Sequence, residues 1–283
     1  MPEGDTIFRT AQTLDRALGR QVVIRFASVL PALTRVDQDA PIAGRVVERV
    51  WSQGKHLLIG FSGGLVLRTH MRMNGSWHVY RPGEHWRRPR TLARIVIETA
   101  TFVAVAFHVP VAEFHAGRDL ERGRVLGELG PDLLANTFDV ETALRRLRQR
   151  AQVAVGDALI DQRAVAGIGN VYKSEVLFVC GVNPFTQVER LTDGDLRRLV
   201  ETARRLLQAN VAPGTDAGIA TYHPLRRTTG RAHPEARLWV YGRAGLACRR
   251  CGAPIQRRKQ GPDARSTYWC ARCQASTGVG PNV

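Results

Sequence analysis

The sequence predicts a multidomain α+β protein in three parts: an N-terminal β-sandwich with a leading helix, a central helical domain and a C-terminal zinc-finger β-hairpin. Three observations predict it. Short segments rich in β-branched residues recur between residues 21 and 107, helical periodicity replaces them in residues 140–210, and four cysteines near the end have the spacing C-x2-C-x18-C-x2-C. We expect domain boundaries that give residues 1–125, 126–236 and 237–283.

The first domain is predicted to begin with a helix. Apolar residues recur every three or four positions in residues 6–18, which indicates an amphipathic helix. Short strands separated by turns such as Gly63-Gly64 follow it, and this spacing favours an all-β sandwich or barrel. The expected strands are residues 21–26, 45–51, 56–61, 65–69, 76–80, 93–98 and 102–107.

The second domain is predicted to be helical. A Gly- and Pro-containing loop at residues 126–132 marks its start. Between the second and third helices, the two glycines and the asparagine of Ala166-Gly-Ile-Gly-Asn170 suit a tight helix-turn-helix junction. The basic segment 212–236 is expected to be a mobile loop. The expected helices are residues 140–149, 155–163, 171–180 and 191–210.

The cysteine spacing predicts one structural Zn²⁺. Two disulfides are the alternative, but they need an oxidising compartment, and the sequence shows no export signal. Cys180 lies apart in an apolar stretch and is expected to be a small buried residue. The expected zinc ligands are Cys248, Cys251, Cys270 and Cys273.

The charge predicts a polyanionic partner. Lys and Arg number 41 against 25 Asp and Glu, a net charge of +16, which favours nucleic acid. A membrane surface is the alternative, but the basic residues are spread along the chain rather than gathered in one amphipathic helix. No stretch approaches the roughly 18 apolar residues of a membrane span, and the first residues are acidic, so we expect a soluble cytoplasmic protein.

The start of the chain offers a candidate nucleophile. Removal of Met1 would expose the secondary amine of Pro2 beside Glu3 at the start of a helix. An α-amino group has an ordinary pKa near 8, so part of it is neutral at pH 7, and the positive end of a helix dipole would raise that part. Such an amine can attack aldehyde-like carbons. The alternative is that Pro2 is simply a favourable first residue of a helix.

Two cationic side chains are further candidates. Lys55, in Gly54-Lys55-His56, is expected at a hairpin tip between two strands, where a solvated lysine is the alternative. Arg265 lies between the cysteine pairs, where a zinc-held hairpin would fix its guanidinium for binding phosphate. In a plain zinc ribbon it would be a surface charge.

Five separated motifs in this order resemble the formamidopyrimidine-DNA glycosylase and endonuclease VIII family. The resemblance covers nearly the whole chain, and it is the combination that carries it, because each motif alone is weak. The motifs are Met1-Pro-Glu-Gly4, Gly54-Lys-His-Leu57, Leu129-Gly-Pro-Asp132, Asp161-Gln162 with Val165-Ala-Gly-Ile-Gly-Asn-Val-Tyr-Lys-Ser-Glu175, and Val240-Tyr-Gly-Arg243.

The resemblance implies a bifunctional DNA glycosylase and abasic-site lyase of base excision repair, whose helical domain is a helix-two-turn-helix module. In that family Pro2 would attack C1′ of the damaged nucleoside to form a Schiff base, and Glu3 would donate a proton that helps to open the sugar. Lys55 matches a lysine with acid/base and phosphate roles. Arg265 matches a zinc-finger arginine tied to phosphate binding and δ-elimination, and Asn170 matches an asparagine that holds the lesion phosphate. Such an enzyme flips its target base out of the duplex.

The segment Thr69-His-Met-Arg-Met-Asn-Gly75 bears on the subfamily. Met73 matches an apolar wedge of the family, and Arg72 matches a polar intercalating residue of endonuclease VIII-like enzymes; a core methionine is the alternative. The Asp-x-Arg-Arg-Phe-Gly loop of the oxidised-purine branch is absent, since residues 107–113 read Phe-His-Val-Pro-Val-Ala-Glu. These features favour an endonuclease VIII-like bacterial enzyme that removes oxidised pyrimidines and cleaves by β,δ-elimination.

The sequence leaves three alternative functions. They are an 8-oxoguanine or formamidopyrimidine glycosylase, a non-catalytic damaged-DNA-binding protein of the same fold, and a zinc-ribbon RNA-binding protein. Asp5 and Thr6 stand where the family commonly has Pro and Glu, and Glu128 stands at a position that can be arginine. We expect a monomer in the bacterial cytoplasm whose partner is double-stranded DNA with oxidised bases or abasic sites.

Overall fold

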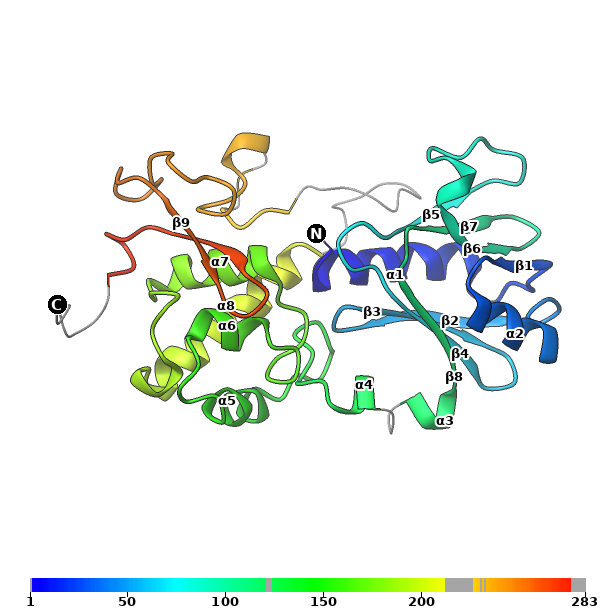
Figure 1. Cartoon of the computed structure of the whole chain (residues 1–283), viewed down its shortest axis with the longest axis horizontal. Coiled ribbons are helices and arrows are strands. Elements are labelled where there is room, and N and C mark those ends of the chain that lie inside the picture. Colours follow the sequence, from blue (N-terminus) through cyan, green and yellow to red (C-terminus); the bar gives the residue numbers. More distant parts are fainter. Residues whose placement is uncertain (1, 121–123, 212–225, 230, 232, 276–283) are drawn as a thin grey trace. The chain divides into compact units, whose positions relative to one another are not determined.

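The computed structural model describes residues 2–120, 124–211, 226–229, 231 and 233–275 (Figure 1). The chain divides into two compact units, of which the first contains the described residues up to Glu128 and the second contains Leu129–Asn210 and the described residues after 225. Most of the loop expected at 212–236 lies outside the described residues, and the three-domain division stays a prediction. None of the helices among the described residues is long and apolar enough to cross a membrane.

The first unit contains two antiparallel four-stranded sheets, so the expected β-sandwich is present. One sheet has the order β1-β6-β7-β5 and the other the order β2-β3-β4-β8. The strands are β1 (Arg25–Ser28), β2 (Val47–Gln53), β3 (His56–Phe61), β4 (Leu65–His70), β5 (Ser76–Tyr80), β6 (Ala93–Glu98), β7 (Val103–Phe107) and β8 (Val111–Ala116).

One apolar core joins both sheets to the leading helix α1 (Gly4–Leu18), which runs beside the strands in Figure 1. Leu14 of α1, Phe61 of β3 and Trp77 of β5 are all fully buried in this core. The Trp77 indole Nε1 donates a hydrogen bond to Thr69 Oγ1 at 3.2 Å, which satisfies its polar atom inside the core. The core therefore holds the first residues of α1 against the sandwich.

Several elements of the first unit differ from those expected. The strand expected at residues 21–26 is displaced along the chain to β1, because Val22 makes only an isolated bridge to Val46. Helix α2 (Pro31–Asp39) was not expected, since it buries only Leu33 and has no side-chain cap. Strand β8 was not expected either, because it is an edge strand with no fully buried residue. The short helices α3 (Gly117–Leu120), α4 (Arg124–Gly127) and η1 (Arg90–Leu92) complete the unit.

The second unit contains the four expected helices: α5 (Val140–Arg148), α6 (Val155–Ile160), α7 (Asn170–Cys180) and α8 (Asp193–Ala209), with η2 (Val188–Arg190) and η3 (Pro234–Ala236). Sequence signals set their ends. Asp139 caps α5, Thr192 and Asp195 form a capping box on α8, and Gly181 ends α7 at φ 71°. Helix α6 is shorter than expected because the Asp161 carboxylate accepts the backbone N–H of Arg163, which closes a turn.

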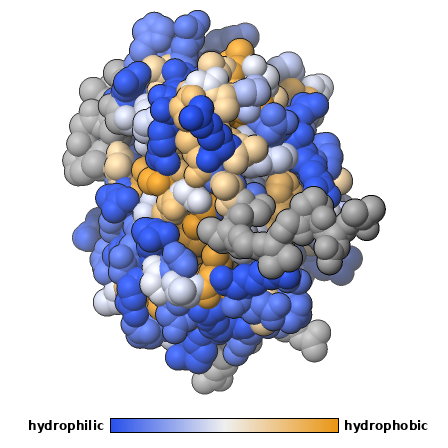
Figure 2. Space-filling model, turned by 90° about the vertical axis from the view of Figure 1, so that its left-hand side faces the viewer, coloured by the Kyte–Doolittle hydropathy of each residue, from blue (hydrophilic) through white to orange (hydrophobic). Residues whose placement is uncertain are grey.

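An antiparallel hairpin of β9 (Gln256–Gln260) and β10 (Arg265–Trp269) belongs to the second unit. Its small core contains Phe178 of α7 together with Val240 and Ile255. Figure 2 shows one face of the molecule, on which hydrophilic side chains predominate among the described residues and hydrophobic ones are exposed in smaller groups. That surface agrees with the high net charge of the chain.

Candidate active site and zinc site

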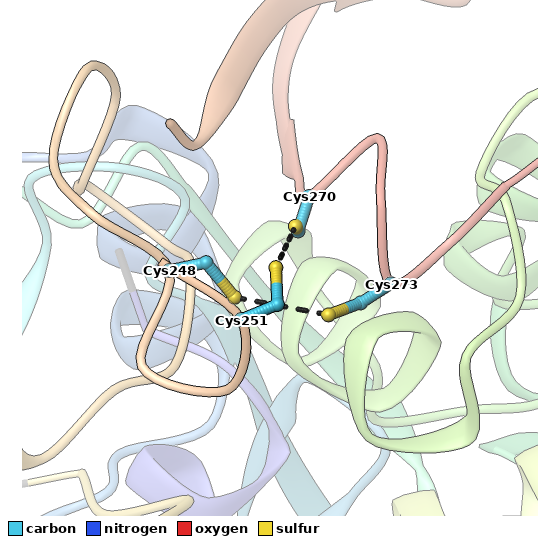
Figure 3. A group of neighbouring side chains, drawn as sticks. All are labelled: Cys248, Cys251, Cys270 and Cys273. Carbon is cyan, nitrogen blue, oxygen red and sulfur yellow. Dashed lines mark hydrogen bonds between the residues drawn. The ribbon is translucent and has the colours of Figure 1, made fainter. Parts of the chain in front are cut away.

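The four cysteines of the expected zinc site gather at one point (Figure 3). Their sulfur atoms all lie within 4.8 Å of one another, and none of the four cysteines forms a disulfide. Cys251 Sγ lies 3.4 Å from Cys270 Sγ, and Cys248 Sγ lies 3.9 Å from Cys273 Sγ. A tetrahedron with Zn–S bonds of about 2.3 Å has sulfurs about 3.8 Å apart, so the cluster fits one structural Zn²⁺. Cys180 lies outside this cluster.

Arg265 begins strand β10, opposite Gln260. Its guanidinium donates from Nε and Nη2 to Asp263 Oδ2, at 3.1 and 2.9 Å. The Arg265 side chain is 35% exposed, so the pair is a surface pair that contributes little to stability. Asp263 orients the guanidinium, and a phosphate would compete with this carboxylate for it.

The motif at residues 129–132 packs against the motif at residues 161–175 around Gln162. The Gln162 side chain donates to the carbonyl oxygens of Ile160 and Ile168 and accepts the N–H of Gly167. Gly130 packs so closely on the chain at Ala164 that a Cβ there would lie 2.4 Å from the Ala164 carbonyl oxygen. These contacts fix the junction that leads into α7.

Asn170 is the first residue of α7, where backbone N–H groups lack partners within the helix and attract anions. The residue is 6% exposed, and its side-chain Nδ2 donates to the carbonyl oxygen of Ser266 at 2.7 Å. Its Oδ1 has no hydrogen-bond partner among the described residues. The structure therefore brings Asn170 to the strand that carries Arg265.

A buried polar network, which sequence analysis missed, holds the hairpin on the helices. Lys173 is fully buried, and its Nζ donates to Thr267 Oγ1 of β10 at 2.6 Å. Thr267 in turn donates to Gln260 Oε1 at 2.7 Å, and Gln260 Nε2 donates to the Pro184 carbonyl oxygen at 2.9 Å. The hairpin position is thus set by hydrogen bonds as well as by the cysteine cluster.

Glu175, the last residue of the motif at residues 165–175, is also fully buried. Its carboxylate accepts the backbone N–H groups of Trp239, Val240 and Tyr241 at 2.8 to 2.9 Å, and the hydroxyl of Thr228 also donates to it. Burial raises the pKa of Glu175, and these hydrogen bonds act in the opposite direction. Glu175 therefore fixes the segment that leads into the zinc site.

Replacing Glu175 with Gln is expected to destabilise the protein by about 3 kcal/mol, because the new amide would face buried N–H donors that lose their acceptor. Urea unfolding measures the change. Glu201→Gln, at an exposed position of α8, is the matched control and should change stability by less than about 0.5 kcal/mol. Equal stability of the two variants would contradict the role assigned to Glu175.

In the first unit, Pro2 and Met73 line the same pocket. Its volume is about 310 Å³, and the remaining lining residues are Asn74, Gly75, Arg88 and His108. Beside Pro2, Glu3 is fully buried and precedes the first turn of α1. Two residues that were predicted separately, the nucleophile and the wedge, therefore lie at one pocket.

The turn after β4 presents Arg72 and Met73. Arg72 has a left-handed backbone with φ 50°, and Met73 is 64% exposed, so it is not a core methionine. A Cβ at Gly75 would lie 2.5 Å from the Met71 carbonyl oxygen, so the tight turn requires glycine there. An exposed apolar side chain on a tight turn has the geometry of a wedge.

Lys55 lies where it was expected, in the two-residue connection of the β2–β3 hairpin, in which Gln53 pairs with His56. Gly54, with φ 57°, allows the turn. Lys55 is half-buried, and its charge is one of those that lower the pKa of His70. Arg72 lowers the same pKa, so both cations lie near His70.

Buried Arg68 organises a cluster beneath these cations. Its guanidinium pairs with Glu113 at 2.6 Å and lies 3.1 Å from His56 Nδ1. His70 Nδ1 accepts the backbone N–H of Arg72 at 3.1 Å, which ties the wedge turn to β4. Burial first, and then the charges of neighbouring side chains, lower the pKa of His56 to about 3 and that of His70 to about 4.

The protein is expected to lose stability as the pH falls from about 6.5 to about 4. The unfolded chain binds protons at His56 and His70 near pH 6.5, whereas the folded chain excludes them until about pH 3 and 4. The slope from His56 alone is at most about 1.4 kcal/mol per pH unit. Urea unfolding from pH 4.5 to 7.5 should give a smaller slope for His56→Asn than for the native chain, and identical slopes would contradict this origin.

Known protein families match each of these parts of the chain. The chain matches the N-terminal domain of formamidopyrimidine-DNA glycosylase over residues 1–110, the H2TH domain of that enzyme over residues 129–221, and a zinc finger found in FPG and IleRS over residues 245–275. The zinc-finger match and the cysteine cluster together give the chain one structural zinc.

Similar proteins extend over the full length. A probable endonuclease 8 2 of Streptomyces coelicolor is 42% identical, over 99% of this chain and 96% of its own. The DNA-(apurinic or apyrimidinic site) lyase Nei2 of Mycolicibacterium smegmatis is 37% identical, over 98% and 100%. The Lactococcus lactis Fpg, solved in complex with abasic-site DNA, has the same fold with a TM-score of 0.80 at 21% identity, covering 97% of this chain and 100% of its own. With such full-length relatives, this chain belongs to the formamidopyrimidine-DNA glycosylase and endonuclease 8 family.

Proposed function

We propose that this protein is a bifunctional DNA glycosylase and abasic-site lyase of base excision repair, with the amine of Pro2 as its nucleophile. The observation that carries the proposal is the pocket at which Pro2 lies with Met73 and Arg88, in a chain of this family. Relatives named endonuclease 8 and apurinic or apyrimidinic site lyase support the two activities.

The first step is attack of the Pro2 nitrogen on C1′ of the damaged nucleotide. The bond from C1′ to the base breaks, and the base leaves with a proton. The Pro2 nitrogen gives up its N–H proton, which balances the proton that leaves with the base. Opening of the sugar ring then gives an iminium ion, whose nitrogen carries no hydrogen because Pro2 is a secondary amine. Glu3 is fully buried beside Pro2 and would supply the proton to the ring oxygen.

Strand cleavage then follows by elimination. Loss of a C2′ proton expels the 3′ phosphate, a second elimination expels the 5′ phosphate, and water releases the sugar remnant from Pro2. Lys55, half-buried on its hairpin, would assist proton transfer and bind phosphate. Both eliminations release anions, which a positively charged surface stabilises.

The second unit would hold the phosphates of the damaged strand. The helix N-terminus at Asn170 and the guanidinium of Arg265 are the proposed contacts, supported by the hydrogen bond from Asn170 to Ser266. The zinc held by the four cysteines is structural and supplies no step of the reaction. Met73 would fill the gap left by the flipped nucleotide, with Arg72 beside it on the same turn.

We further propose oxidised pyrimidines as the preferred bases. The relatives named endonuclease 8 are 42% and 39% identical, whereas a formamidopyrimidine-DNA glycosylase of Thioalkalivibrio sulfidiphilus is 32% identical. We also propose a monomer that acts in the cytoplasm; light scattering of the purified protein tests the monomer.

A panel of duplexes, each with one defined lesion, tests the substrate. Excision should be at least about tenfold faster for an oxidised pyrimidine than for 8-oxoguanine, with cleavage of an abasic site as the positive control. Faster excision of 8-oxoguanine would assign the protein to the oxidised-purine group. Cleavage of the abasic site without excision of any base would show that the protein has the lyase activity and lacks the glycosylase activity.

A further inference from the structure

The connection between β5 and β6 is strongly basic. Residues 81–90 contain four arginines, at positions 81, 87, 88 and 90, against the single carboxylate of Glu84. Glu84 closes its own turn, since its carboxylate accepts the N–H of Arg81 at 2.8 Å. With four guanidinium groups against one carboxylate, this connection, which we call the arginine loop (residues 81–90), carries a net positive charge.

Aromatic packing fixes the arginine loop to the sandwich. Half-buried Trp86 stacks on Tyr80, with centroids 6.2 Å apart, and meets the edge of Phe107 at 5.8 Å. The Tyr80 hydroxyl accepts the backbone N–H of Arg87 at 3.1 Å, and the Arg90 guanidinium lies 4.9 Å from the Trp86 ring centroid. The loop is therefore anchored on both sides of Arg88.

Arg88 connects this loop to the Pro2 pocket. It is half-buried, lines that pocket, and also lines a second pocket of about 400 Å³ within the arginine loop. Among the described residues, no carboxylate forms an ion pair with it. Its charge acts on His78, whose pKa is lowered to about 4 by burial and by the charges of Arg88 and Arg87. The charge of Arg88 is thus left uncompensated beside the nucleophile.

We propose that Arg88 binds a backbone phosphate of the DNA strand next to the nucleotide attacked by Pro2. This inference rests on the proposed function and adds a phosphate site in the first unit to those proposed at Asn170 and Arg265. A planar guanidinium offers paired donors that match two phosphate oxygens, and its cost of partial burial is recovered only when an anion is bound. A phosphate contact also suits an enzyme that must act in any sequence context.

The test measures the affinity of the full chain for a duplex with a tetrahydrofuran abasic analogue at several salt concentrations. Arg88→Ala should weaken binding about tenfold at low salt and reduce the slope of log K against log salt by about one. Arg88→Lys should keep the slope but lose part of the affinity. Arg35→Ala, at an exposed position of α2, is the matched control and should change neither quantity.

Neutral methylphosphonates locate the contact. Replacing each phosphate near the analogue in turn should weaken binding by the native chain at one position at which Arg88→Ala is insensitive. Unchanged affinity and slope for Arg88→Ala, or equal sensitivity of both proteins at every position, would overturn the proposal. If Arg88→Ala fails to fold, Arg88→Gln takes its place in the same comparison.

The two proposals fail in different ways. Borohydride trapping of Arg88→Ala on abasic DNA at saturating protein should reach the native yield, because the variant keeps the amine of Pro2. Absence of trapping with the native chain would defeat the proposed function, whereas native trapping with an unchanged phosphate profile in Arg88→Ala would defeat only the Arg88 site.

Discussion

Blocking the amine of Pro2 is expected to abolish the borohydride-trapped cross-link to a duplex with one abasic site. A chain that keeps Met1, or carries any other residue before Pro2, has an amide in place of the secondary amine, so it cannot form an iminium ion. Strand cleavage should fall by about 10³-fold or more. Pro2→Gly, which keeps an amine but loses the ring that lines the pocket, should cross-link more slowly than the native chain.

The matched control for this experiment is binding to DNA that cannot react with the amine. Affinity for a tetrahydrofuran duplex should stay within about threefold in the blocked chain, because phosphate contacts dominate affinity. A cross-link of native yield in the blocked chain would identify another amine. Lys55 is then the first candidate. Loss of the cross-link in a blocked chain that also carries Lys55→Ala would identify Lys55 as the nucleophile.

Features that depend on local sequence could be predicted. The cysteine spacing alone gave the zinc site, because two close pairs can reach one metal wherever the rest of the chain lies. The helices of the second unit follow from apolar periodicity and end at local signals such as Gly181. Edge strand β8 and helix α2 have almost no apolar pattern of their own, and their form depends on the strands that they contact.

Residues of the candidate site could be predicted only where the residue type and its position in the chain indicate a chemical role. Pro2 was singled out by its amine at the start of the chain and Met73 by its position in the family, but their common pocket depends on contacts between distant parts of the chain. Arg88 is one arginine among many in the sequence, and only its half-buried place at that pocket distinguishes it. Glu175 reads as an ordinary helical glutamate until the backbone of residues 239–241 is placed against it.

Removing the zinc is expected to weaken DNA binding by about 100-fold or more while the β-sandwich stays folded. The hairpin has a core of few residues, so without metal its strands lose most of what holds them, and the guanidinium of Arg265 loses its fixed position. The core of the sandwich contains no residue of the hairpin. Chelation, or Cys270→Ser, should therefore raise hydrogen exchange in β9 and β10 and leave that of β3 and β7 unchanged.

Cys180→Ser is the matched control, because Cys180 lies outside the cluster and has its Sγ 3.7 Å from the Arg198 carbonyl oxygen. It should retain one zinc per chain and bind DNA within about twofold of the native affinity. Unchanged affinity together with raised hydrogen exchange in β9 and β10, after verified loss of zinc, would show that the hairpin is not a DNA contact, and the role of Arg265 in phosphate binding would have to be abandoned. Unchanged hydrogen exchange would instead show that the hydrogen bonds from Lys173 and Asn170 are sufficient to hold the hairpin without metal.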